Sequence, residues 1–389
     1  MFRRELQKVL LERLAQFPIV VLMGPRQSGK TTLLENISGY DYINLESPDQ
    51  LERMQMDPKG QLAYTKPNGI IIDEAQNYPE LFSYIQVISD KNKKKGEFIL
   101  SGSQNFTLSQ YITQSLAGRA AILELLPLTY TEYLSSPTQG QLSIWDWLYG
   151  GGYPRPYQEN IPVKIWMDNY VRTYLERDVR SLLKVKDLGL FQRFLKLCAG
   201  RHGQLLNSSQ LSMDCGISHT TVMHWISLLE ASYLVFRLQP YHNNFQKRLT
   251  QSSKLYFYDS GLVCYLLGID SPQHLSLHSA RGAIFEGYII SELYKYCYNH
   301  NESPRLFFWR DSNGNEIDCL LECGGELRAI EIKSSATLAP HLFKSLKKWQ
   351  IISGIPAESC HLVYAGEPQQ KDFSGIKVLA WNELEHFLD

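Results

Sequence analysis

Two stretches of the sequence combine residue types that can act on phosphate groups. The first is GPRQSGKT at residues 24–31, which matches the pattern GxxxxGK[ST]. Glycines let backbone N–H groups wrap around phosphates, and the start of the following helix adds the positive end of its dipole. Lys30 can reach the β- and γ-phosphates of ATP, and the Thr31 hydroxyl can bind Mg²⁺. The predicted nucleotide-binding residues are Gly24, Pro25, Arg26, Gln27, Ser28, Gly29, Lys30, Thr31 and Thr32.

An acid pair extends this predicted ATP site. The apolar run GIIID ends in Asp73-Glu74, and ligands of open α/β sheets bind at the carboxyl ends of the strands. Asp73 is expected to hold the Mg²⁺ shell, and Glu74 to orient or deprotonate the attacking water. The run EFILSG leads to Gln104 and Asn105, and either amide has the chemistry to sense the γ-phosphate. The alternative is that the two acids only cap a strand.

The second stretch is NEIDCLLECGGELRAIEIK at residues 315–333. Its two strand-like runs flank Gly324-Gly325, a suitable two-residue hairpin loop. That loop places Asp318 opposite Glu331 with Cβ atoms about 5 Å apart. Lys333 shares a face with Glu331, because side chains two positions apart lie on the same side of a strand. A divalent cation held by the two acids, with Lys333 near the scissile phosphate, would form a phosphodiesterase site.

The elements that carry these residues follow from the apolar patterns. Five short apolar runs predict a parallel five-stranded sheet flanked by helices; they lie at 18–23, 42–46, 69–73, 97–102 and 120–125. Further on, Asn207 and Ser218 are N-cap candidates for two short helices separated by Gly216. Two strand-like runs, YLVFRLQPY and KLYFYD, come next, which is the order of a winged helix. Residues 207–231 contain no Lys or Arg, so this segment fits packing against its neighbours as well as it fits DNA binding.

The nucleotide-binding third resembles a known family. GPRQSGKTTLL, IIIDEAQNYP, ILSGSQNF and SLAGRAAILELLPLTYTEY are similar to bacterial and archaeal AAA+-type ATPases. The resemblance implies a winged-helix segment and a restriction-endonuclease-like domain after the ATPase core. It also implies that Arg119 is an arginine finger or sensor that contacts phosphate. The alternative for Arg119 is a surface ion pair. If Arg119 acts from a neighbouring copy, the active form is a homo-oligomer.

The hairpin resembles the PD-(D/E)xK nucleases, with Asp318 as the first acid and Glu331-Ile332-Lys333 as ExK. Ile317 stands where the motif's name has Pro. The resemblance implies an αβββαβ core and a further metal-binding acid from the preceding helix, for which Glu286 is the preferred residue and Glu292 the less favoured one. The alternative is a fold kept for DNA docking or packing, with its acids paired with Lys333, Arg310 or Arg328.

Composition limits the remaining possibilities. The 389 residues carry a formal net charge of −1, so any DNA-binding surface must be a local patch. Seven scattered Cys predict reduced, mostly buried thiols. The N-terminus lacks the pattern of a signal peptide and no apolar run is long enough to cross a membrane, so we expect a cytoplasmic protein with no membrane partner.

The sequence therefore predicts an α/β protein in three parts. Residues 1–136 form an AAA+-type P-loop domain, 137–275 a helical linker and winged helix, and 276–389 a restriction-endonuclease-like domain. The predicted function is Mg²⁺-dependent ATP hydrolysis coupled to a DNA-binding or DNA-cleaving module, with a second Mg²⁺ or Mn²⁺ at the nuclease-like site left open. One alternative is an ATP-controlled switch or scaffold whose nuclease-like domain only binds DNA or a protein. Another, a small-molecule kinase, has little support because no acceptor pocket is marked.

Overall fold

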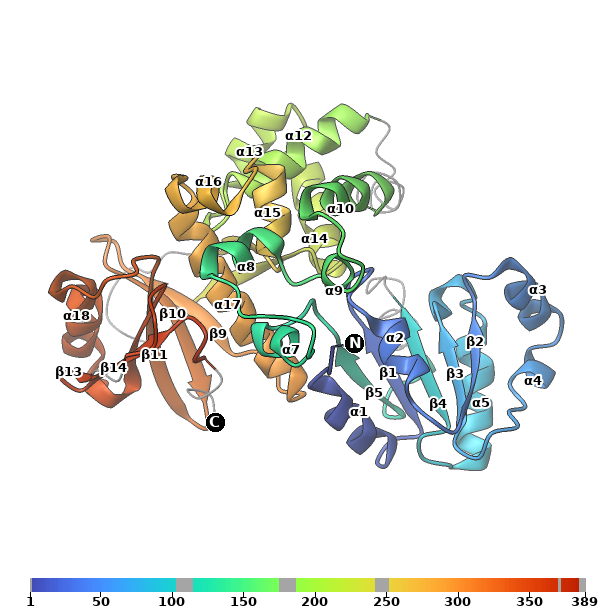
Figure 1. Ribbon diagram of the computed structural model, residues 1–389. Helices are drawn as coiled ribbons and strands as arrows, with labels where there is room; N and C mark the ends of the chain where they lie inside the picture. Colours follow the sequence, from blue (N-terminus) through green and yellow to red (C-terminus); the bar gives the residue numbers. More distant parts are fainter. Residues whose placement is uncertain (1, 103–114, 175–186, 242–251, 370–371, 385–389) are drawn as a thin grey trace.

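Two sheets organise the molecule, one at each end of the view in Figure 1. The computed structural model describes residues 2–102, 115–174, 187–241, 252–369 and 372–384. Of the residues singled out in the sequence, Gln104 and Asn105 lie outside these ranges. The long helix α17 (Arg281–Asn299) runs between the two sheets and contacts elements of both.

The first sheet confirms the predicted parallel α/β architecture. Its five strands are β1 (Ile19–Met23), β2 (Tyr40–Asn44), β3 (Gly69–Asp73), β4 (Phe98–Gly102) and β5 (Ala120–Glu124). They are all parallel, in the order β2-β3-β4-β1-β5. Strand β2 begins two residues earlier than predicted. Because parallel strands share one carboxyl edge, the residues that follow β1 and β3 are gathered there.

Helices cover both faces of this sheet, as strands buried on both sides require. On one face α1 (Leu6–Leu14) and α2 (Lys30–Glu35) pack on Val20, Leu22 and Ile71. On the other, α5 (Leu81–Asn92) packs on Val21 and Ile72. The short helices α3 (Pro48–Met56), α4 (Pro58–Gln61) and η1 (Ala75–Asn77) complete the nucleotide-binding third.

The middle of the chain is helical. It contains α7 (Tyr130–Leu134), α8 (Ile144–Gly150), α9 (Pro154–Gln158), α10 (Val163–Tyr170), α12 (Leu188–Ala199), α13 (Ser208–Cys215), α14 (His219–Ala231), α15 (Ser260–Leu266) and α16 (Pro272–Leu277). The predicted caps are confirmed: the Asn207 and Ser218 side chains accept hydrogen bonds at the starts of α13 and α14, and Gly216 ends α13 with φ 71°. β7 (Val235–Pro240) and β8 (Lys254–Phe257) then pair antiparallel, and β6 (Gln204–Leu205) adds to β8.

The second sheet crosses the predicted boundary between residues 275 and 276. It contains β9 (Leu306–Arg310), β10 (Glu316–Cys323), β11 (Glu326–Lys333), β12 (Cys360–Tyr364), β13 (Asp372–Phe373) and β14 (Ile376–Ala380). Strand β7 pairs parallel with β9, so the order is β13-β14-β12-β11-β10-β9-β7-β8-β6. The small sheet of the middle segment is therefore continuous with the sheet of the C-terminal third.

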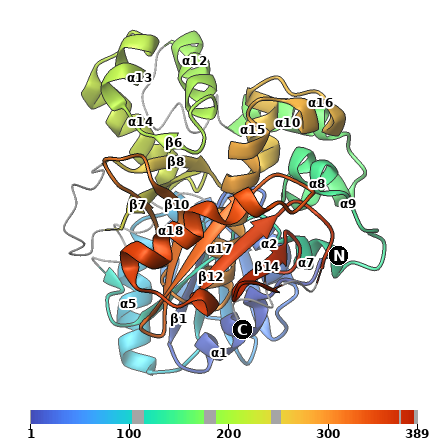
Figure 2. The same cartoon turned by 90° about the vertical axis from the view of Figure 1, so that its left-hand side faces the viewer.

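Helices also cover the second sheet on both faces. Helix α17 packs on one face, with Cys319 and Ile330, while α18 (Lys344–Ser353) packs on the other, with Leu320 and Ala329. Figure 2 shows α18 in front of this sheet. The turns η3 (Pro340–Phe343) and η4 (Ala357–Ser359) flank α18. The order α17-β9-β10-β11-α18-β12 is the αβββαβ order that the sequence implied.

All seven Cys are free thiols, and all except Cys323 are buried, as predicted. Among the described residues, no helix is both long and apolar enough to cross a lipid bilayer.

Candidate functional site

The P-loop follows β1 and requires glycine at two positions. Gly24 has φ 152°, and a Cβ there would lie 2.1 Å from the Leu125 carbonyl oxygen. Gly29 has φ 96° and precedes the first residue of α2. Only glycine adopts both conformations without strain. The loop therefore turns tightly enough to direct its backbone N–H groups toward an anion at the start of α2.

Lys30 holds its charge inside this loop. Its Nζ donates to the carbonyl oxygens of Gly24 and Pro25 at 3.0 and 2.9 Å. The side chain is buried, and burial lowers the Lys30 pKa although Glu74 opposes the shift. Within the described part of the chain, the Gln27 side-chain oxygen and the Ser28 hydroxyl are also buried without hydrogen-bond partners. A buried lysine and unpaired polar atoms in one loop fit the binding of phosphate groups.

Asp73 collects hydroxyl groups at the carboxyl edge of the sheet. The Thr31 and Tyr42 hydroxyls both donate to its Oδ2 at 2.7 Å, and the Ser101 hydroxyl donates to Oδ1. Thr31 and Asp73, the two predicted Mg²⁺-binding residues, are thus in direct contact. Tyr42 was not predicted, because nothing in the sequence marks which tyrosine of β2 faces the end of β3.

The remaining predicted residues of the ATP site lie around this contact. Glu74 follows β3 in the left-handed region at φ 54°, and its carboxylate accepts from Gln76. Arg26 forms a 2.6 Å ion pair with Glu46, which is 58% exposed. Pro25 is buried in the loop and Thr32 is exposed on α2. The structure therefore brings the P-loop, Asp73 and Glu74 together at one edge.

Arg119 is not part of this assembly. It precedes β5, and parallel pairing aligns the start of β5 with the start of β1, at the edge opposite the P-loop. Its guanidinium instead forms a two-bond ion pair with Asp90 of α5 at 2.6 and 2.9 Å. Strands of five residues separate the two edges by about 16 Å. Arg119 therefore cannot contact phosphate in its own P-loop, and the surface ion pair is the arrangement observed.

Arg4 contacts the P-loop from behind and was not predicted. It is 7% exposed, donates to the Ser28 carbonyl oxygen at 2.6 Å, and pairs with the buried Glu132 at 3.0 Å. A third bond reaches the Leu126 carbonyl oxygen at 2.6 Å. The N-terminal segment thereby links the P-loop to the chain that leaves β5. An arginine among other charged residues near an N-terminus gives no sequence signal for such burial.

The hairpin of the C-terminal third has the predicted register. Gly324 and Gly325 have φ 59° and 83°, and Cys319 pairs with Ile330. A β-bulge interrupts the pairing of β10 with β9 between Ile317 and Leu320. Bulges re-aim side chains, and this one accompanies Asp318. Lys333 Nζ lies 3.1 Å from Asp318 Oδ2 and 2.7 Å from Glu331 Oε1, so the three predicted residues meet.

Glu286 joins the same acid cluster but pairs with a different lysine. Lys254 of β8 places its Nζ 2.9 Å from Glu286 Oε1 and 2.5 Å from Glu316 Oε1. Burial raises the Glu286 pKa to about 7, and nearby Asp318 adds to the shift. Glu292, the less favoured choice, lies elsewhere: it pairs with Lys295 at 2.7 Å and accepts from the Tyr130 backbone N–H.

The predicted second metal site does not fit this arrangement. Over the described ranges, no three His, Cys, Asp or Glu side chains converge as metal ligands. Asp318 and Glu331 share Lys333, while Glu286 is held by Lys254. The expected ligand set of Glu286, Asp318 and Glu331 is therefore neutralised by lysines rather than arranged around one cation position. Acids paired with Lys333 were the alternative that the sequence left open.

A pocket of about 420 Å³ opens over this cluster. Asp318, Glu331 and Lys333 line it together with Lys344 and Lys348 of α18. The α18 lysines were not predicted as site residues, because they lie on an exposed helix face that reads as ordinary solvated charge. The pocket combines buried acids with exposed cations.

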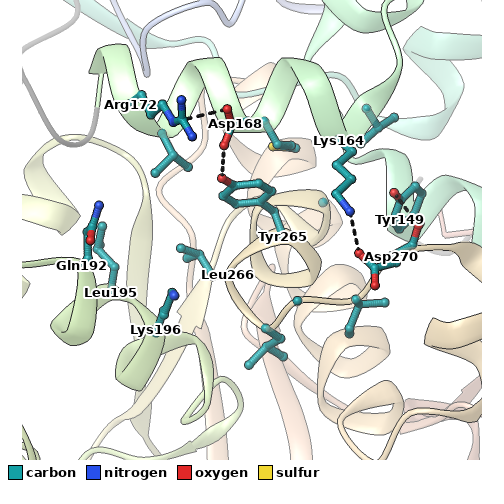
Figure 3. Close-up of a pocket in the computed structure, with 17 residues that line it drawn as sticks. Tyr149, Lys164, Asp168, Arg172, Gln192, Leu195, Lys196, Tyr265, Leu266 and Asp270 are labelled. Carbon is teal, nitrogen blue, oxygen red and sulfur yellow. Dashed lines mark hydrogen bonds and ion pairs between the residues drawn. The ribbon is translucent and has the colours of Figure 1, made fainter. Parts of the chain in front are cut away.

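A larger pocket of about 600 Å³ lies away from both sites, between α10, α12 and α15. Figure 3 shows several of its charged side chains paired with one another. Lys164 pairs with Asp270 at 2.9 Å, and Asp168 binds both Arg172 and the Tyr265 hydroxyl. These charges are satisfied within the wall of the pocket, so they do not mark a reactive centre.

Three family descriptions match successive parts of the chain. Residues 16–134 match an AAA domain, 141–273 a domain of unknown function (DUF8612), and 281–384 a domain of unknown function (DUF4143). The Walker-type ATPase PABY2304 of Pyrococcus abyssi is similar in structure at 15% identity and a TM-score of 0.39, over 68% of this chain and 96% of that one. The AAA domain supports ATP binding and hydrolysis, usually with Mg²⁺.

Two mycobacterial proteins match most of the chain. Uncharacterized protein Rv2008c of Mycobacterium tuberculosis and uncharacterized protein Mb2031c of Mycobacterium bovis are each 31% identical over 371 residues. The match covers 94% of this chain and 80% of each relative. With this identity over nearly its whole length, the chain belongs to the same family as these two mycobacterial proteins.

Proposed function

We propose that the protein is an Mg²⁺-dependent ATPase whose nucleotide state controls a DNA-binding C-terminal module. In the ATPase domain, residues 24–32 hold the phosphates, Lys30 neutralises them, and Thr31 with Asp73 holds Mg²⁺. Mg²⁺ supplies charge neutralisation at the phosphates when it is bound. Glu74 orients the attacking water. Gln104 remains the proposed sensor of the γ-phosphate.

The observation that carries the DNA-binding part is the pocket over the acid cluster. Lys333 of β11 and Lys344 and Lys348 of α18 line it, and lysines bind the phosphodiester backbone without reading sequence. These lysines form a local positive patch, which is compatible with a net charge of only −1 for the whole chain. The order of α17, three strands, α18 and β12 supports a nuclease-like fold for this module, and the helix pair α13–α14 with β7 and β8 supports a winged helix beside it.

Buried contacts give the nucleotide site a physical route to this module. Arg4 joins the Ser28 carbonyl of the P-loop to Glu132. Four residues before Glu132 in the sequence, the Leu128 carbonyl oxygen accepts a hydrogen bond from Lys295 of α17 at 3.0 Å. Helix α17 also carries Glu286 of the acid cluster. A change in the P-loop can therefore alter contacts of the helix that carries Glu286, one acid of the cluster next to the proposed DNA pocket.

Strand cleavage is a second candidate function. Its supporting observation is that Asp318, Glu331 and Lys333 meet in one pocket on adjacent strands. Since the acids do not form a metal site as they stand, no cleavage step is assigned to them. The order of preference is thus ATP-controlled DNA binding first and cleavage second.

The test is DNA binding measured by fluorescence anisotropy with labelled single- and double-stranded DNA, with and without ATP. In the Glu74→Gln variant we expect ATP to bind without turnover. The protein should then stay in the ATP-bound state and keep the DNA affinity of that state. Replacing Lys344 and Lys348 by Ala should weaken binding about tenfold and flatten its salt dependence. Lys347→Ala is the matched control, because Lys347 lies over the Phe373 ring instead of lining the pocket. DNA affinity unchanged by the double substitution would exclude this pocket.

A further inference from the structure

The acid cluster of the C-terminal module contains a buried cation of its own. Lys254 is only 4% exposed, and its ammonium contacts carboxylate oxygens of both Glu286 and Glu316. The Tyr256 hydroxyl, two residues along β8, also donates to Glu286. An ammonium is rarely buried unless it is paired, because its desolvation is costly. Two carboxylates therefore hold the Lys254 ammonium, and the Tyr256 hydroxyl fixes one of them.

The charges around Lys254 keep it in the ammonium form. Burial alone would lower the Lys254 pKa, but Glu286, Glu316 and Asp318 outweigh burial and raise it. Arg310 adds a second cation at 3.4 Å from the other oxygen of Glu316. On the far side of Asp318, Lys333 pairs with both Asp318 and Glu331. The cluster is thus a row of four acids whose charges are met by lysine and arginine.

We propose that the Lys254 ammonium is the resident cation of this site and keeps a divalent ion from binding at Glu286, Glu316 and Asp318. The proposal rests on the proposed function, since it concerns regulation of the same C-terminal site. A divalent ion needs several of the same oxygens, and it repels an ammonium placed between them. Occupation of the acids by Lys254 and by a metal therefore exclude each other.

The resident cation comes from a different part of the chain. Lys254 opens β8, which pairs with β7, and β7 pairs with β9 at the edge of the C-terminal strands. The segment before residue 275 thereby completes a site whose acids lie after it. This origin distinguishes Lys254 from Lys333, which shares a strand with one of its acids. The metal affinity of the cluster is consequently set by the position of β8.

The experiment is a Mn²⁺ titration of the full-length protein without nucleotide, followed by electron paramagnetic resonance of free Mn²⁺. We expect no Mn²⁺ bound at the cluster in the wild type at submillimolar concentrations. The Lys254→Met variant should bind one Mn²⁺ per chain at least about tenfold more tightly. Lys254→Arg keeps the charge and should not gain the site. The double variant Lys254→Met, Glu286→Gln should lose it again.

Lys295→Met is the matched control. Lys295 is also 4% exposed and pairs with a carboxylate of α17, but Glu292 is its single acidic partner among the described residues. Its removal should create no Mn²⁺ site. If both lysine variants gained Mn²⁺ equally, loss of any buried lysine would explain the gain and the proposal would fail.

Two outcomes decide the proposal without any Lys254 variant. Wild-type Mn²⁺ binding that disappears in Asp318→Ala would overturn it, because the metal would then bind despite the ammonium. In amine-selective acylation read by mass spectrometry, Lys254 should stay equally protected with chelator and with millimolar Mn²⁺. Protection should also hold at submillimolar Mn²⁺, and labelling of Lys254 that increases in that range would mean that the metal takes the carboxylates from the ammonium at low concentration, which overturns its role as resident cation. Absence of DNA binding would count against the proposed function alone and leave these results unaffected.

Discussion

The two charged sites of this molecule hold their lysines in opposite ways. Lys30 donates to two backbone carbonyl oxygens, and its pKa is lowered by burial. Lys254 and Lys333 each touch two carboxylates, which outweigh burial and raise their pKa values. In the described part of the chain, the Lys30 ammonium thus contacts backbone carbonyl oxygens while Glu74 and Asp73 act on it only from a distance, whereas the lysines of the acid cluster contact carboxylates directly. The first site is prepared for an anionic ligand, and the second must rearrange before it accepts a metal.

The largest effect should come from removing the Lys30 ammonium. Lys30→Ala should reduce ATP turnover by about 100- to 1,000-fold, the range for losing one preorganised charge-stabilising group. Phosphate release at saturating ATP measures it, with Lys91→Ala on the exposed face of α5 as control. DNA affinity without ATP should stay unchanged, because Lys30 does not touch the C-terminal pocket. ATP turnover close to that of the wild type would mean that Lys30 has no role in hydrolysis. The proposed contrast between a lysine prepared for ATP and lysines already paired with acids would then fail.

Sequence reasoning succeeded where chemistry depends on neighbours along the chain. The P-loop and the Gly324-Gly325 hairpin are local patterns. Because parallel strands end at one edge of the sheet, the sequence could place Thr31 near Asp73, and the hairpin register could place Asp318 beside Glu331 and Lys333. It failed where partners come from distant segments. Lys254 reaches Glu286 across strand pairings that no local pattern specifies. Arg4 reaches the P-loop only because α1 folds back over the sheet.

The Arg119 expectation shows a different limit. The sequence around Arg119 resembles that of the AAA+-type family. The distance between Arg119 and the P-loop, however, depends on which edge of the sheet Arg119 occupies. Because the strands are parallel, a residue that precedes β5 lies at the edge opposite residues that follow β1. Topology thus excludes a contact of Arg119 with its own P-loop, and a contribution to the P-loop of another copy stays a prediction.

The second-largest effect should test the connection between the two sites. Arg4→Met leaves Glu132 buried without its cation, and breaking a buried ion pair costs about 3–5 kcal/mol. We expect the urea midpoint of the nucleotide-binding domain to fall accordingly and ATP to lose its influence on DNA affinity. Arg3→Met is the matched control, since Arg3 is exposed next to it. Equal stability of the two variants would show that the buried network does not support the P-loop.

The unfolding free energy should depend on pH because of Glu124, a partly buried acid at the end of β5. Burial raises the pKa of Glu124, at the end of β5, from 4.5 to about 7. The folded protein therefore keeps a proton that the unfolded chain releases. Its stabilising contribution is complete below pH 4.5 and is lost as pH rises through about 7. Glu124→Gln should remove this loss, on the order of 3 kcal/mol in unfolding free energy. Glu12→Gln on the exposed side of α1 should leave the wild-type pH profile in place, and an identical profile for both variants would contradict the assignment.

The smallest expected effect concerns Arg119. It tests whether Arg119 contributes to ATP turnover in its own chain or in another copy. Its pair with Asp90 is about one-third to one-half exposed, so Arg119→Ala should change the unfolding free energy by less than about 1 kcal/mol. Since about 16 Å of sheet lies between Arg119 and its own P-loop, turnover of the dilute variant should equal that of the dilute wild type. A difference that grows with protein concentration would mean that Arg119 completes the P-loop site of another copy. A loss already present at high dilution would contradict the parallel arrangement that keeps Arg119 and Lys30 at opposite edges.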